Sequence, residues 1–312
     1  MGRGLLTWSL CLGALLVLYF GGLVNPLVYL VAGVLAPLPV ILAGWRLGER
    51  AAILVALTAV MCIFLLKPGL EIILNNLAFG NLLLMGVLIS CLRYRGLSPE
   101  RAIIYTLMAL NLVALLFILG QAHWSRVSLQ ALLGQKGTEL VDTLHRVLGG
   151  MGREASGVVA PGAAQSQMEF WVQRLLPGLV IVNGGLTVWL NVVLSRQVAY
   201  LLGWGQEEPP LYYWSAPEWL IFVVLAAGFL LIVPVAGVRV FSLNLLMVMG
   251  LCYFFQGMAV VAALFHRWGL PRLLRLLGYL LIFLNPFVFL IITLGLMDLW
   301  LDFRRLQQPG KA

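Results

Sequence analysis

Long apolar runs separated by short polar turns dominate this chain and restrict it to a membrane environment. Hydrophobic residues make up 62% of its 312 residues, charged residues make up only 10%, and the mean hydropathy is +1.00. A soluble domain of this size could not bury so much apolar surface, whereas about 20 consecutive apolar residues form a helix that spans a bilayer. The sequence therefore predicts an all-α, polytopic bundle of transmembrane helices whose main partner is the lipid bilayer.

Nine apolar runs can be delimited, and they predict eight or nine membrane spans. The runs cover residues 1–24, 27–45, 51–66, 72–92, 99–119, 171–202, 219–235, 240–265 and 270–306. Pro37 and Pro39 remove two backbone donors from the second run, which is therefore expected to be kinked where neighbouring helices satisfy the freed carbonyls. Asn285-Pro286 interrupts the last run. Either interruption can prevent a full crossing, so the parity of the spans stays open.

A long polar connection, residues 121–169, divides the runs unequally. Within it, Leu140, Val141, Leu144, Val147 and Leu148 recur at helical spacing, which predicts an amphipathic extramembrane helix. We expect an N-terminal membrane bundle over residues 1–203, including this insertion, and a set of C-terminal membrane helices over residues 204–312 packed on it.

The basic residues indicate the orientation of the chain. The net charge is +8, but the Lys and Arg residues lie at the ends of apolar runs, which favours the positive-inside rule over nucleic-acid binding. If the N-terminus is cytoplasmic, the cytoplasmic ends of the apolar runs carry most of the arginines, namely Arg3, Arg46, Arg50, Arg93, Arg95, Arg101, Arg196, Arg267, Arg272 and Arg275. We therefore expect a multi-pass protein of the bacterial inner membrane with its N-terminus in the cytoplasm.

Residue patterns typical of enzymes are missing from the sequence. The three histidines are far apart, no HExxH, GxSxG, Walker A or GxGxxG pattern occurs, and the four cysteines all lie in apolar runs without a CxxC pair. We expect no catalytic residue, no metal site, no cofactor and no enzymatic activity. The chain carries no ATP-binding motif.

Amide side chains supply most of the polar groups within the apolar runs. Uncharged amides can line a pocket and hydrogen-bond a small polar solute, or they can join helices to one another. Asn111, Asn183 and Asn191 lie deep enough in their runs to line a cavity and are the candidate ligand-binding residues. Gly250 and Gly257, seven residues apart, predict a close approach between helices.

The last run carries the acidic pair Asp298 and Asp302, with Arg304 and Arg305 directly behind it. On a helix, a spacing of four places both carboxylates on one face. Two interpretations remain: a helix end tied by the arginines at the membrane interface, or a proton or cation relay deeper in the membrane.

Three stretches of the sequence carry a family resemblance: PLPVILAGWRLGERAAILVAL, RGLSPERA, and the late pair YFFQGMAVV with LGLMDLWLDFRR. They resemble the YybS-like bacterial inner-membrane proteins over most of the chain. The first five or six runs are also similar in arrangement to the substrate-binding S components of energy-coupling-factor transporters. The resemblance marks positions of interest for interaction or structure, namely Gln256, Gly257, Asp298, Asp302, Phe303 and Arg304.

Two functional hypotheses follow. The first is a transporter-like protein that binds a small polar solute in an amide-lined cavity and depends on a separate energising ATPase and a coupling membrane protein. The second is a membrane scaffold without transport activity, whose amphipathic helix and C-terminal tail recruit envelope or division proteins.

Overall fold

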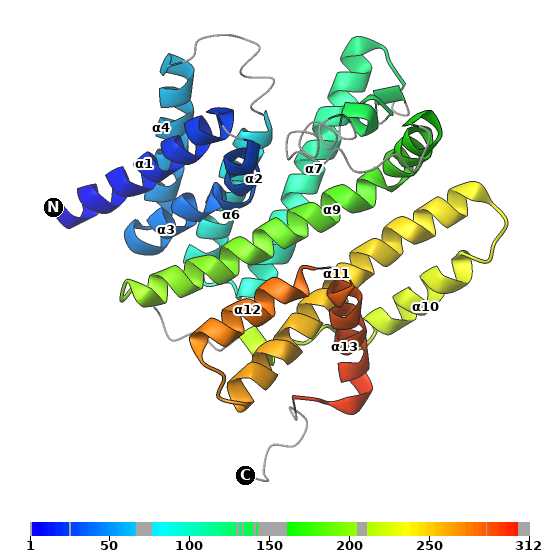
Figure 1. The fold of residues 1–312 in the computed structure, drawn as a ribbon. Coiled ribbons are helices and arrows are strands. Elements are labelled where there is room, and N and C mark those ends of the chain that lie inside the picture. The colour runs from blue at the N-terminus through cyan, green and yellow to red at the C-terminus, as the bar shows by residue number, and fades with distance from the viewer. Residues whose placement is uncertain are drawn as a thin grey trace. The chain divides into compact units, whose positions relative to one another are not determined.

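The computed structural model is all-helical over the residues that it describes. These are residues 2–24, 26–66, 77–128, 131–132, 134–139, 142, 161–204, 211–284 and 286–304, and no strand occurs among them. The helices, labelled as in Figure 1, are α1 (Gly2–Val24), α2 (Pro26–Leu35), α3 (Pro37–Leu47), α4 (Glu49–Leu66), α6 (Leu77–Tyr94), α7 (Pro99–Ser125), α9 (Pro161–Leu201), the 3₁₀ helix η1 (Leu211–Tyr213), α10 (Leu220–Leu230), α11 (Ala236–Arg267), α12 (Arg272–Ile282) and α13 (Phe287–Leu301). The amphipathic helix predicted at 140–148 lies outside the described residues except for Asp142, and Asn285 and Arg305 lie outside them as well.

The helices form two compact units. The first comprises residues 1–173 and 183–206, and the second comprises residues 174–182 and 207–312, so the long helix α9 contributes to both. The functional division predicted at residue 203 stays a prediction.

In the first unit, α3 and α6 cross at close range because two positions carry no side chain. A Cβ atom on Gly44 would lie 2.6 Å from Cβ of Ser90, and one on Gly86 would lie 2.9 Å from the carbonyl oxygen of Pro37. Small residues allow this kind of backbone approach between membrane helices. Apolar side chains from α1, α3, α4 and α6 form one buried cluster on this framework, and side chains from α3, α6, α7 and α9 form another.

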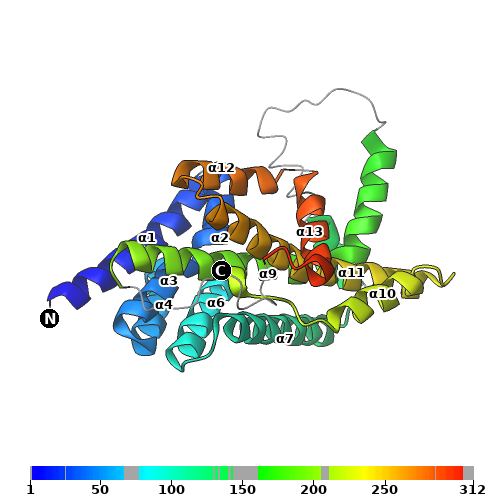
Figure 2. The same cartoon turned by 90° about the horizontal axis from the view of Figure 1, so that it is seen from below.

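In the second unit, α11 is the central helix. The short helix α10 runs beside it in both ribbon views, and α13 crosses it (Figures 1 and 2). Gly257 of α11 and Gly295 of α13 make the crossing possible, because a Cβ atom on either would overlap backbone atoms of the other helix. The close approach predicted for Gly257 is therefore confirmed, whereas a Cβ on Gly250 would come no nearer than 3.9 Å to the side chain of Ile292.

Five described helices are long and apolar enough to cross a membrane, or six if the bent pair α12 and α13 counts as one span. The fully spanning candidates are Gly4–Val24, Glu49–Leu66, Pro99–Ser125, Phe170–Leu201 and Ala236–Arg267. The predicted count of eight or nine thus depends on shorter apolar helices, Val31–Leu47, Phe79–Tyr94 and Leu220–Leu230. The last of these has 11 residues. At 1.5 Å per residue it is about 16 Å long, half the thickness of a hydrocarbon core.

The two proline-interrupted runs are both broken, as the sequence predicts. The second run is divided into α2 and α3 at Ala36, and α12 and α13 are bent by 101° relative to each other. Ser98 and Pro99 occupy the N-cap and first-turn positions of α7, although the Ser98 side chain makes no capping hydrogen bond.

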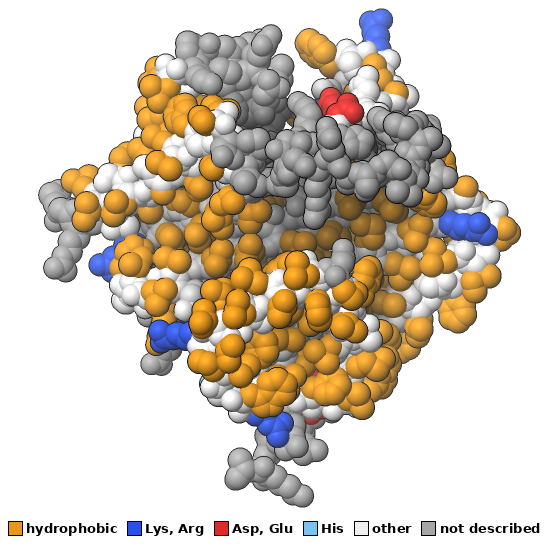
Figure 3. Space-filling model, viewed as in Figure 1, with side chains coloured by type: hydrophobic (Ala, Val, Ile, Leu, Met, Phe, Trp, Pro, Cys, Tyr) orange, Lys and Arg blue, Asp and Glu red, His pale blue; other side chains and the backbone are white. Residues whose placement is uncertain are grey.

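Among the coloured side chains in Figure 3, hydrophobic ones predominate, and the Lys and Arg side chains that are drawn lie at separate points. Leucine, valine and phenylalanine side chains with more than half of their area exposed occur on helices of both units, including Val17 at 71%, Phe222 at 69% and Leu273 at 67%. Such a surface requires lipid around it, because soluble proteins rarely expose contiguous apolar patches of this extent.

Candidate functional site

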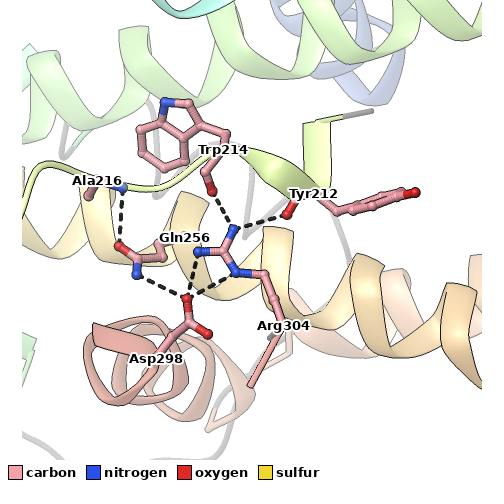
Figure 4. A network of polar contacts seen from close by, with 6 residues as sticks. All are labelled: Tyr212, Trp214, Ala216, Gln256, Asp298 and Arg304. Carbon is pink, nitrogen blue, oxygen red and sulfur yellow. Dashed lines mark hydrogen bonds and ion pairs between the residues drawn. The ribbon is translucent and has the colours of Figure 1, made fainter. Parts of the chain in front are cut away.

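A buried ion pair joins Asp298, near the end of α13, to Arg304 (Figure 4). Arg304 donates from Nε and Nη2 to the Oδ2 atom of Asp298, at 3.0 and 2.6 Å, and both side chains are only 3% exposed. Gln256 of α11 donates to the same oxygen from Nε2 at 3.2 Å. One carboxylate oxygen therefore accepts three hydrogen bonds, and the charge of Asp298 is matched by that of Arg304.

The cluster also fixes the segment between η1 and α10. Arg304 donates from Nη1 to the carbonyl oxygens of Tyr212 and Trp214, and the Oε1 atom of Gln256 accepts from the backbone N–H of Ala216 at 3.3 Å. Arg304 thus connects the chain after α13 to a segment 90 residues earlier. The sequence carries no signal for the two carbonyl partners, because backbone acceptors exist at every position.

All six positions that the family resemblance marks lie in the second unit, and three of them are in direct contact. Gln256 and Arg304 contact Asp298, and Gly257 lies at the crossing of α11 and α13. Phe303 and Arg304 both line a hollow described below.

Asp302 differs from the expectation. It does not share a helix face with Asp298, because α13 ends at Leu301 and Asp302 adopts the left-handed C-cap conformation with φ 40°. Its backbone N–H donates to the carbonyl oxygen of Asp298 at 3.1 Å. A residue at the end of a helix leaves the helical path, so the spacing of four no longer places it on the same face.

The arrangement is suited to holding helices together. The Oδ1 atom of Asp298 is buried and has no hydrogen-bond partner, whereas Oδ2 accepts three bonds. The interpretation of a helix end tied by an arginine matches the contacts made by Arg304. Among the described residues, no group of three His, Cys, Asp or Glu side chains lies close enough to hold a metal ion.

A hollow of about 240 Å³ lies beside this cluster, at the C-terminal end of α11. Its lining residues are Tyr212, Tyr213, Ala263, Leu264, His266, Arg267, Phe303 and Arg304. The rings of Tyr212 and His266 stack with centroids 5.5 Å apart and an interplanar angle of 21°. The pKa of Tyr212 lies above its ordinary value, because burial and a hydrogen bond with Tyr213 favour the neutral phenol.

In the first unit, Asn191 lies at the break between α2 and α3. Its Nδ2 atom donates to the carbonyl oxygen of Val34 at 2.7 Å and to that of Thr187 at 2.8 Å. The side chain is fully buried, and its Oδ1 atom has no hydrogen-bond partner. Asn191 therefore satisfies a carbonyl at the proline-broken helix, as the paired prolines predict for a neighbouring helix.

Asn244 of α11 does the same at Pro177, in the second unit. It donates to the carbonyl oxygen of Arg174 at 2.9 Å and accepts from the backbone N–H of Gly178 at 2.6 Å. A proline inside a helix removes one donor and disturbs the neighbouring hydrogen bonds, so an amide with one donor group and one acceptor can bridge the disturbed turn.

The other two candidate ligand residues are placed less favourably. Asn111 of α7 donates to the carbonyl oxygen of Leu107 in its own helix at 2.8 Å, and Asn183 of α9 is exposed. The helices α7 and α9 are neighbours, since a Cβ on Gly184 would lie 3.6 Å from the Leu107 side chain. Neither the hollow lined by Arg304 nor a hollow at the end of α7, lined by Ala122, His123, Trp124 and Arg126, includes Asn111, Asn183 or Asn191.

These features define a multi-pass α-helical membrane protein whose broken helices are held by buried amide and ion-pair contacts. Residues 13–299 match the family described as predicted membrane protein (DUF2232), and the chain belongs to this family. Neither the curated proteins nor the solved structures contain a match to the chain.

Proposed function

We propose that the protein is a transporter-like membrane protein that binds a small polar solute at the broken helix α2/α3, with Asn191 as the main contact. The finer topology of eight or nine spans, a bacterial inner-membrane location and a cytoplasmic N-terminus belong to the same proposal, as does the resemblance to the YybS-like proteins. Because the sequence contains no ATP-binding motif, active uptake would use a separate ATPase and a coupling membrane protein.

The observation that carries this proposal is the position of Asn191. Transporters often bind their substrates where a discontinuous membrane helix exposes backbone polar groups to a buried site. Asn191 is completely buried beside such a break, with its amide nitrogen used twice and its Oδ1 atom unpartnered. A buried polar atom without a partner is uncommon and calls for an explanation, and a solute donor that reaches Oδ1 after a small opening of the helices supplies one.

A thermal-stability screen tests the proposal. The purified full-length protein, in mild detergent, is heated with a panel of small polar solutes, and the ligand-induced shift in Tm is measured. We expect at least one solute to raise the Tm of the wild type and to leave Asn191→Leu unshifted relative to its own ligand-free value.

Asn244→Leu is the matched control, because it also removes an amide that bonds to a carbonyl at a proline break, here a partly buried one, but lies in the other unit. It should retain the ligand-induced shift even though its ligand-free Tm falls. A shift of equal size in Asn191→Leu and the wild type would remove Asn191 from the binding site, and the absence of any stabilising solute would count against a solute-binding role.

The scaffold alternative depends on residues 140–148 and on the tail after Arg304. Of these residues the structure describes only Asp142, and no observation favours the scaffold.

A further inference from the structure

We propose that the hollow at the C-terminal end of α11 binds a phosphate-bearing anionic group, such as a lipid head group. This site is separate from the solute site proposed above, since every residue that lines it belongs to the second unit. The two proposals can therefore fail independently.

The chemistry of the lining favours an anion. Arg267 and His266 supply cationic or protonatable nitrogens, Tyr212 and Tyr213 supply hydroxyl groups, and no carboxylate is among the lining residues. The nearby carboxylate of Asp298 is already paired with Arg304, so it does not cancel the charge of Arg267. An exposed guanidinium next to phenolic hydroxyls is well suited to a phosphate oxygen.

The buried cluster gives this hollow a fixed wall. The guanidinium of Arg304 is held by Asp298 and by the carbonyl oxygens of Tyr212 and Trp214, so it positions η1 against the end of α11. The stacked rings of Tyr212 and His266 are thereby kept together at the rim. Arg304 acts as a positioning residue, and Arg267 is the residue expected to contact the anion.

Size and position favour a head group over a whole soluble ligand. The hollow holds about 240 Å³. Pockets that enclose drug-sized ligands begin at roughly 300 Å³. Tyr213 is 54% exposed and Trp268, which follows α11, is 62% exposed, and such aromatic side chains favour the head-group region of a bilayer. Basic pockets at helix ends are known binding places for anionic lipid head groups.

Native mass spectrometry of the full-length protein provides the first arm of the test. The protein is released from detergent in the presence of phosphatidylglycerol or phosphatidylcholine, and the bound lipid is counted as a function of lipid concentration. We expect phosphatidylglycerol to bind more tightly than phosphatidylcholine. Arg267→Gln should weaken it roughly fivefold, the effect typical of one basic residue at an anionic surface.

Arg272→Gln is the matched control, since Arg272 is also exposed and lies five residues further on but does not line the hollow. It should change the affinity by much less than Arg267→Gln. Equal effects of the two substitutions would indicate attraction to surface charge in general and would overturn the proposal. Equal binding of the two lipids would overturn the lipid assignment.

Inorganic phosphate provides the second arm and separates the two sources of the anion. The shift in Tm with millimolar phosphate is compared with that with chloride at equal ionic strength, for the wild type and Arg267→Gln. A phosphate-specific shift that Arg267→Gln removes, without preference for phosphatidylglycerol, would support a free phosphate group as the ligand. If neither phosphatidylglycerol nor inorganic phosphate binds in a manner that depends on Arg267, the proposal is wrong.

Discussion

Asp298 and Arg304 illustrate how a charge can be kept inside an apolar protein. Burying an ion costs several kcal/mol, and the opposite charge repays this only when further hydrogen bonds satisfy both groups. Arg304 meets this condition through two backbone carbonyls, whereas Asp298 meets it only at Oδ2, which also accepts from Gln256, and its Oδ1 atom has no partner. The side chains therefore depend on each other, and removing one leaves the other charge buried without compensation.

A double-mutant cycle measures this dependence. We expect Asp298→Asn and Arg304→Gln each to lower the free energy of unfolding by about 3 to 5 kcal/mol, the usual cost of breaking a buried pair. The double variant should lose less than the sum of the two, by about 0.5 to 3 kcal/mol. Thermal and denaturant unfolding in detergent, followed by tryptophan fluorescence, give the values. Arg239→Gln is the control, because that side chain is exposed and donates only to the carbonyl oxygen of Val233. Strictly additive losses would contradict the buried pair.

At the scale of helices, the crossing of α11 and α13 depends on two glycines that face each other. The sequence predicts a close helix approach at Gly257, a small residue within an apolar run. It does not predict that Gly295 is the facing residue, because no sequence pattern pairs a glycine with a partner 38 residues away. The backbone atoms of the two helices lie so close at this point that neither position has room for a methyl group.

Substitution of either glycine should therefore separate the helices. We expect Gly257→Ala and Gly295→Ala each to destabilise the protein by about 1 to 3 kcal/mol or more, because the added methyl group forces a backbone shift. Gly250→Ala, on the same helix, should cost at most about 1 kcal/mol, and its higher helix propensity can even stabilise α11. Tm values of the three variants in the same detergent test the expectation. A cost for Gly250→Ala as large as that for Gly257→Ala would show that the crossing lies elsewhere.

Asn244 offers a second test at this scale. Asn244→Leu should cost about 1 to 3 kcal/mol, because it leaves the carbonyl of Arg174 and the N–H of Gly178 without the amide that bridges them. In a Pro177→Ala background the cost should be smaller, since a regular helix lets these two groups bond to each other. Unfolding free energies of the four proteins provide the measurement. The same cost in both backgrounds would mean that the amide does not serve the proline break.

The sequence predicts the elements of this fold better than it predicts their extent. The kink at Pro37 and Pro39 and the start of α7 at Pro99 follow from local chemistry, and the structure has both. The length of α10 does not follow, because the apolar run continues to Val235 while the helix ends at Leu230 and the chain turns before Pro234. Hydropathy indicates which segments can lie in the apolar part of a membrane. The C-terminal end of α10 depends instead on the backbone geometry before Pro234 and on contacts with α11.

At the scale of the molecule, basic residues gather at one end of the first unit. The guanidinium of Arg46 lies 5.5 Å from the ring centroid of Trp204, and Nε of Arg95 lies 3.8 Å from the Glu49 carboxylate. The turns that follow α3, α6 and α9 therefore share this end. That this end faces the cytoplasm, as the positive-inside rule favours, stays a prediction. The sequence does not predict the role of the asparagines in this way, because an amide in an apolar run can bind a ligand or hydrogen-bond a backbone carbonyl. Only the structure shows that Asn191 bonds to the carbonyl oxygen of Val34.

Cysteine labelling from the two sides of the membrane tests this arrangement. In a background with Cys11, Cys62, Cys91 and Cys252 replaced by alanine, single cysteines are placed at the exposed positions Tyr94 and Leu202, and at Arg126 after the far end of α7. With 27 residues and a length of about 40 Å, α7 is long enough for its two ends to reach opposite faces of the bilayer. A membrane-impermeant maleimide applied to intact cells should label Arg126→Cys, whereas Tyr94→Cys and Leu202→Cys should react only after the membrane is opened. Labelling of Tyr94→Cys and Leu202→Cys from opposite sides would show that α7 and α9 do not both cross, and the basic turns would then lack a common face.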